Sequence, residues 1–152
     1  MFPSPASYLA HDNHLALFEF LGKIMGKAVY EHILVDVPLA RFFISKLLGR
    51  KNFFNDLPSL DPQLYKNLIF LKNFDGNFDE LALNFTVVND EYGQQEEREL
   101  VVNGKNISVS KDNKFNYIFR VAHYRLNVQI LEQSKAFLKG FNQLIPREWL
   151  QM

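Results

Sequence analysis

Few residues of this chain have the types and the spacing that catalysis or metal binding requires. His11 and His14 are three residues apart, as metal ligands on a helix can be, but no third ligand stands near them. Asp79 and Glu80 are adjacent, so on a helix they would not face each other as an acid–base pair does. The chain also lacks cysteine, a Gly-x-Ser-x-Gly elbow and a glycine-rich phosphate loop. The sequence therefore predicts no catalytic residue, no metal site and no cofactor.

A stripe of leucines is the most regular apolar feature outside the N-terminal third. Leu64, Leu68 and Leu71 recur at steps of four and three, which places them on one face of a helix, and Phe74 extends that face. A leucine stripe at helical spacing is ordinarily part of a core, but it can also line a groove that binds a partner. The chain is rich in aromatic residues, with fifteen Phe, six Tyr and one Trp, which suit either a core or a surface that binds a partner. Both interpretations stay open from the residues alone.

The elements that would position these side chains are mainly helical. Asp12 or Asn13 is expected to cap a helix over residues 14–32, Pro38 to begin one ending at Gly49, and Asp61-Pro62 to begin one ending near residue 74. Helical periodicity returns at about 112–141, with a break near 126–127. Between them, residues 83–88, 99–102 and 107–109 predict short strands, with a tight turn at Asn103-Gly104. The expected fold is α+β, mainly helical with a small antiparallel β-meander.

The first long helix has a distinct pattern of apolar and small residues. Its apolar positions predict one buried stripe, made of Leu17, Leu21, Ile24, Met25, Ala28 and Val29. Gly22 and Gly26 are four residues apart and would let another element approach the helix closely.

Length, composition and charge limit the class of protein. With 152 residues, 47% hydrophobic and 22% charged, the chain suits one globular domain or less. A net charge of zero argues against a general nucleic-acid binder. No apolar run reaches the roughly 18 residues that would indicate a membrane helix. The absence of cysteine fits a location inside the cell. The expected location is the cytoplasm, with the nucleus as an alternative.

The charges are segregated along the chain. Residues 75–99 hold eight acids and one base, whereas residues 105–147 hold eight bases and two acids. Such segregation can steer a charged partner, and it is equally consistent with two solvated faces.

Several motifs, in order and over nearly the whole chain, resemble the HECT-type ubiquitin ligase domain. They are LGKIMGKAVYE (21–31), ILVDVP (33–38), SKLLG (45–49), DLPSLDPQLYKNL (56–68), LNFTV (83–87), NG (103–104), YRLN (124–127), FLKGF (137–141) and EWL (148–150). The third helix and first strand are most similar to the subgroup whose full-length members carry a calmodulin-binding IQ motif.

The resemblance implies a particular domain organisation. It corresponds to the N-lobe alone, with a large subdomain at about 1–49 and 125–152 and a small subdomain at about 50–124. The family's catalytic cysteine lies in the C-lobe, and this chain has none, so the resemblance implies a fragment or a truncated product that is not active alone.

The resemblance also implies a partner and a site. The partner is a ubiquitin-conjugating enzyme, while ubiquitin and protein substrates are engaged through the full-length ligase, and no nucleic acid or membrane is involved. Carried over position by position, the docking groove comprises Leu64, Leu68, Leu71, Phe74, Leu81, Leu83 and Tyr117. Two alternatives remain at this point: a truncated, non-catalytic protein that sequesters conjugating enzymes, and a helical scaffold unrelated to ubiquitin.

Overall fold

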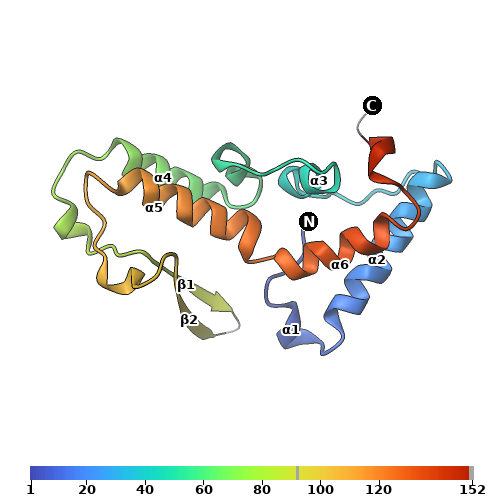
Figure 1. Cartoon of the computed structure of the whole chain (residues 1–152), viewed down its shortest axis with the longest axis horizontal. Coiled ribbons are helices and arrows are strands. Elements are labelled where there is room, and N and C mark those ends of the chain that lie inside the picture. Colours follow the sequence, from blue (N-terminus) through green and yellow to red (C-terminus); the bar gives the residue numbers. More distant parts are fainter. Residues whose placement is uncertain (92, 151–152) are drawn as a thin grey trace. The chain divides into compact units, whose positions relative to one another are not determined.

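The structure is a computed structural model and describes residues 1–91 and 93–150 (Figure 1). The chain forms two compact units, Met1–Asn52 with Leu126–Met152, and Phe53–Arg125. They are called unit 1 and unit 2 below. The chain leaves unit 2 through a π-helical turn, Tyr124–Val128, so the predicted break near residues 126–127 is confirmed.

Unit 1 is built around two long helices that lie side by side. Its helices are α1 (Ser7–Ala10), α2 (His14–Tyr30), α3 (Arg41–Leu47) and α6 (Leu131–Phe141), with a short 3-10 helix at Arg147–Leu150. Helix α2 packs along α6 through glycines, because a Cβ at Gly22 would overlap the carbonyl oxygen of Phe137 and one at Gly140 would overlap that of Glu19. The predicted close approach at Gly22 and Gly26 is confirmed.

The predicted stripe on α2 is wrong. Leu17, Leu21, Ile24 and Val29 are between 45% and 47% exposed, Met25 is half-buried, and Ala28 alone among the six is buried. The reason is that α6 contacts the glycine side of α2, so the large apolar side chains point elsewhere. The expected cap is also absent, since Asn13 occupies the N-cap position without a side-chain capping hydrogen bond.

Unit 2 contains the elements that position the predicted groove. Its helices are α4 (Pro62–Asn73) and α5 (Lys114–His123), which pack against each other, with 3-10 helices at Phe54–Ser59, Phe78–Leu81 and Gly104–Asn106. The start of α4 follows the prediction: Pro62 is its first residue and the Asp61 carboxylate accepts a hydrogen bond from Leu64 N at 2.8 Å.

The sheet of unit 2 is smaller than predicted. Strands β1 (Thr86–Glu91) and β2 (Gln94–Glu99) form an antiparallel hairpin in register from Thr86↔Glu99 to Glu91↔Gln94. Of the predicted strand at 99–102, only Glu99 is in a strand, as the last residue of β2, and the one at 107–109 is reduced to a single bridge, Asn84↔Ser108. The α+β, mainly helical class is confirmed, with a hairpin in place of a meander.

Candidate functional site

All seven residues of the predicted groove lie in unit 2. Leu64, Leu68 and Leu71 are on α4, and Phe74 is the residue that ends this helix. Leu81 ends the next 3-10 helix, Leu83 precedes β1, and Tyr117 lies on α5. Figure 1 shows α4 and α5 side by side, with the β1–β2 hairpin near the other flank of α5.

The seven residues divide by burial into two groups. Leu68, Leu71 and Tyr117 are 4%, 5% and 9% exposed, so intramolecular packing already covers them. The other four, Leu64, Phe74, Leu81 and Leu83, are half-buried and offer part of each side chain to a partner. We call the three buried residues the floor and the four half-buried residues the rim of the predicted groove, and contact with a large partner would fall mainly to the rim.

Tyr117 belongs to the core of unit 2 as well as to the floor. Its ring packs edge-to-face on Phe85, with centroids 5.5 Å apart. Burial raises the pKa of the Tyr117 hydroxyl above its ordinary value, because the phenolate would be poorly solvated there.

Phe74 is held in place by contacts that the sequence pattern did not reveal. Its ring lies 5.6 Å from that of Phe70 and 5.2 Å from that of Phe78. Its carbonyl accepts a 2.8 Å hydrogen bond from Lys114 Nζ, which lies 5.6 Å from the ring centroids of Phe78 and Phe115. Lys114 is only 5% exposed, which is unusual for a lysine. It ties the start of α5 to the end of α4 and thereby fixes the rim at Phe74.

Leu83 also lines a mostly polar cavity of about 230 Å³. Its wall is formed by Phe78, Asp79, Ala82, Leu83, Asn84, Lys105, Ser108 and Val109. Ala82 is in the left-handed region (φ 48°), and the Leu83 carbonyl accepts a hydrogen bond from Val109 N at 2.8 Å. No histidine stands beside Ser108 in this wall to act as a base, so the residues do not form a nucleophilic triad.

The hairpin beside these residues is strongly acidic. Strands β1 and β2 together carry five acidic residues and one basic residue. Lys105 Nζ lies 3.2 Å from a Glu97 carboxylate oxygen, and this hydrogen bond lowers the pKa of Glu97. The remaining negative charge can attract a basic surface on a partner.

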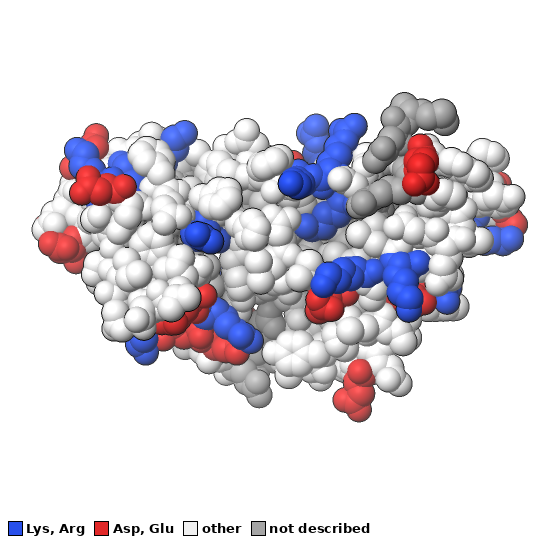
Figure 2. Space-filling model, viewed as in Figure 1, with Lys and Arg blue, Asp and Glu red and all other residues white. Residues whose placement is uncertain are grey.

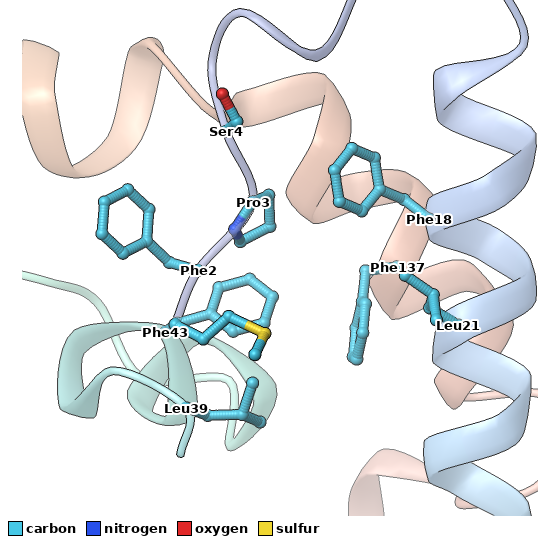
Figure 3. A pocket seen from close by; sticks show the side chains of 9 residues that line it. Phe2, Pro3, Ser4, Phe18, Leu21, Leu39, Phe43 and Phe137 are labelled. Carbon is cyan, nitrogen blue, oxygen red and sulfur yellow. The ribbon is translucent and has the colours of Figure 1, made fainter. Parts of the chain in front are cut away.

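Unit 1 holds a separate, apolar cavity of about 100 Å³ (Figure 3). In Figure 3, Phe18, Leu21 and Phe137 face Phe43 and Leu39 across it. Ser4 contributes the one polar side chain of the wall, which also includes Met1, Phe2 and Pro3. The cavity therefore has no acid or base for catalysis.

Within residues 1–91 and 93–150, no group of three or more His, Asp and Glu side chains could hold a metal ion. In the same part of the chain, no helix is long and apolar enough to cross a membrane.

Comparison with known proteins gives a consistent result. The family model described as "HECT-domain (ubiquitin-transferase)" matches residues 1–152. The chain is 49% identical over 152 residues to "E3 ubiquitin-protein ligase UPL6" of Arabidopsis thaliana and 46% identical over 157 residues to "Ubiquitin-protein ligase E3B" of Homo sapiens. Each alignment covers 100% of this chain and 15% of the relative. A more distant relative, "E3 ubiquitin-protein ligase HUWE1" of Mus musculus, is 34% identical over 149 residues.

Proposed function

Because this chain belongs to the HECT-domain family of ubiquitin transferases, we propose that it supplies the docking surface for a ubiquitin-conjugating enzyme in a ubiquitin-protein ligase. The surface is the rim formed by Leu64, Phe74, Leu81 and Leu83. Leu68, Leu71 and Tyr117 form the floor beneath it. The observation that carries this proposal is the half-buried Phe74 side chain at the end of α4. Lys114 and the rings of Phe70 and Phe78 hold it in place.

A fixed, partly exposed aromatic side chain is well suited to hold a partner. Its side-chain freedom is already restricted, so binding costs little conformational entropy. Burying an aromatic or aliphatic anchor against it is worth roughly 1.5–3 kcal/mol, the scale of an interface hot spot. The acidic hairpin complements a basic patch on the conjugating enzyme and would raise the association rate more than the affinity.

The parent protein is proposed to transfer ubiquitin from the conjugating enzyme to substrate lysines through a thioester on the ligase. The chain contains no cysteine, so the thioester would form on a cysteine outside these 152 residues. Docking has to be transient, because the conjugating enzyme must leave to be recharged. We therefore expect an affinity in the micromolar range, about −8 kcal/mol at the tight end.

Further parts of the proposal concern the domain and the full-length protein. Unit 2 corresponds to the small, conjugating-enzyme-binding subdomain of the N-lobe and unit 1 to the large one; the division of the chain at residues 52–53 and 125–126 supports this. In this proposal the parent protein works in the cytoplasm, with the nucleus as an alternative, and belongs to the subgroup that carries an IQ motif. An IQ motif in the full coding sequence would test the subgroup assignment directly.

A second candidate function follows from the absence of cysteine. A polypeptide that docks conjugating enzymes without accepting ubiquitin would sequester them. The reading frame after Met152 distinguishes the two functions, since a ligase requires it to continue into a lobe that contains a cysteine.

The experiment that tests docking measures binding of the purified chain to a panel of conjugating enzymes. The variants are Phe74→Ala and Leu83→Ala, both at half-buried positions, so each protein is expected to remain folded. The matched control is Phe20→Ala, an exposed phenylalanine in unit 1. We expect each rim variant to weaken binding about tenfold or more and the control to change nothing. Unchanged binding by folded rim variants would reject the groove as the docking site.

A further inference from the structure

Three aromatic side chains outside the predicted groove are largely exposed on the two helices of unit 2. Phe70 on α4 is 61% exposed, and Phe115 and Phe119 on α5 are 59% and 55% exposed. Phe115 and Phe119 are four residues apart and therefore share one face of α5. The Phe119 ring also stacks on His123, with centroids 5.9 Å apart. Several large exposed aromatic side chains on neighbouring elements indicate a surface that binds another molecule.

Phe70 contacts Phe74 directly, and Phe115 is linked to it through Lys114. The rings of Phe70 and Phe74 are 5.6 Å apart. On the other side, Lys114 donates a hydrogen bond to the Phe74 carbonyl while its ammonium lies 5.6 Å from the Phe115 ring. Phe70 and Phe115 therefore lie next to Phe74 of the proposed groove, and Phe119 continues from Phe115 along the same face of α5.

The charge of the two helices differs from that of the hairpin. Helices α4 and α5 carry no acidic residue and four basic ones, of which Lys66, Lys72 and Arg120 are exposed and Lys114 is buried. Figure 2 shows a largely uncharged surface over these helices and a concentration of charged side chains over the hairpin. Unit 2 thus has an acidic hairpin and two helices whose exposed charged side chains are basic.

We propose that Phe70, Phe115 and Phe119 form a second contact surface for the conjugating enzyme, beyond the groove at Phe74. The enzyme surface that fits is an apolar side chain bordered by carboxylates, which would pair with the exposed basic residues Lys66, Lys72 and Arg120. The inference rests on the proposed docking function and adds a determinant of which conjugating enzymes bind. An enzyme that lacks the bordering carboxylates would still reach the groove but would bind more weakly.

The test compares a double variant on α5 with a matched control. Phe115→Ala/Phe119→Ala removes two exposed rings at positions where alanine favours the helix, so the fold is expected to persist. The control, Phe20→Ala/Tyr30→Ala, removes two exposed rings from α2. Dissociation constants for the conjugating-enzyme panel are measured alongside sedimentation of each chain alone.

We expect the α5 double variant to bind its best conjugating enzyme about tenfold more weakly, with no change for the control. Conjugating-enzyme variants whose facing carboxylates are replaced by amides should bind the wild-type chain and the α5 double variant with similar dissociation constants. If Phe74→Ala weakens binding while the α5 double variant binds like wild type, this inference is overturned and the docking function stands. If the α5 double variant changes only self-association, the surface binds a second copy and the inference is likewise overturned. If the folded wild-type chain binds no conjugating enzyme, the docking function fails and this inference fails with it.

Discussion

Replacement of Lys114 by methionine is the most informative perturbation of the proposed docking surface. Lys114 is buried, and its ammonium donates a 2.8 Å hydrogen bond to the carbonyl of Phe74, the residue that ends α4. Methionine keeps an unbranched apolar side chain in the same space between Phe78 and Phe115 but supplies no donor. The substitution therefore tests the contribution of the ammonium without creating a large cavity.

The expected loss of stability follows from the contacts of the ammonium. A hydrogen bond from a charged donor is worth about 1.5–3 kcal/mol, and leaving the buried acceptor unpaired costs a similar amount. The two ring contacts contribute about 0.5–2 kcal/mol. Relief from burying a charge acts in the opposite direction. We expect the net loss in the free energy of unfolding to be about 2 kcal/mol.

Urea denaturation followed by circular dichroism measures this loss. Lys72→Met, an exposed lysine in the last turn of α4, is the control and should lie within about 0.5 kcal/mol of wild type. A Lys114→Met chain as stable as wild type would show that the ammonium does not hold the end of α4. A folded Lys114→Met chain should also bind conjugating enzyme more weakly, because the Phe74 ring is no longer fixed.

Three further predictions concern packing, pH and capping. Gly22→Ala and Gly140→Ala should each lower the free energy of unfolding of unit 1 by about 2 kcal/mol despite better helix propensity, because both methyl groups overlap backbone carbonyls. The double variant should lose less than the sum of the two, since one displacement of α2 from α6 relieves both overlaps. Burial raises the pKa of Tyr117, so its contribution to stability is complete below about pH 10 and is lost as the pH rises through the folded-state pKa. In urea titrations, the free energy of unfolding of wild type should therefore fall relative to that of Tyr117→Phe between pH 8 and pH 10.5. Asp61→Ala should cost about 1 kcal/mol in the same assay, by removing the capping acceptor of α4.

The elements that were predicted correctly are those whose determinants are local in the sequence. Asp61 followed by Pro62 specifies the start of α4 through one side-chain acceptor and one restricted backbone angle, and neither depends on distant residues. Gly22 and Gly26 predicted a close approach because only small side chains permit it.

The errors arose where distant packing decides the outcome. Periodicity placed Leu17, Leu21 and Ile24 on one face of α2 but could not indicate that α6 packs against the glycines instead. Strand β2 was missed because its sequence, QQEERE, has no apolar alternation, and pairing with β1 is what makes it a strand.

The sequence pattern could not predict how deeply each residue of the candidate site is buried. A leucine at helical spacing has the same pattern whether it lies in a core or lines a groove, so Leu68 and Leu64 could not be assigned to floor and rim beforehand. Lys114 was missed because its acceptor, the Phe74 carbonyl, is 40 residues away in the sequence.

The division into floor and rim has a consequence for how tightly a partner can bind. Leu68, Leu71 and Tyr117 have already lost most of their contact with water through intramolecular packing, so a partner gains little by covering them. The binding free energy must then come from the half-buried rim and from exposed side chains such as Phe70 and Phe115. A small apolar contact of this kind dissociates readily, which agrees with the proposed exchange of one conjugating enzyme for the next. Variation of the exposed aromatic residues is therefore expected to change the residence time and the choice of partner, because their removal leaves the core of unit 2 intact.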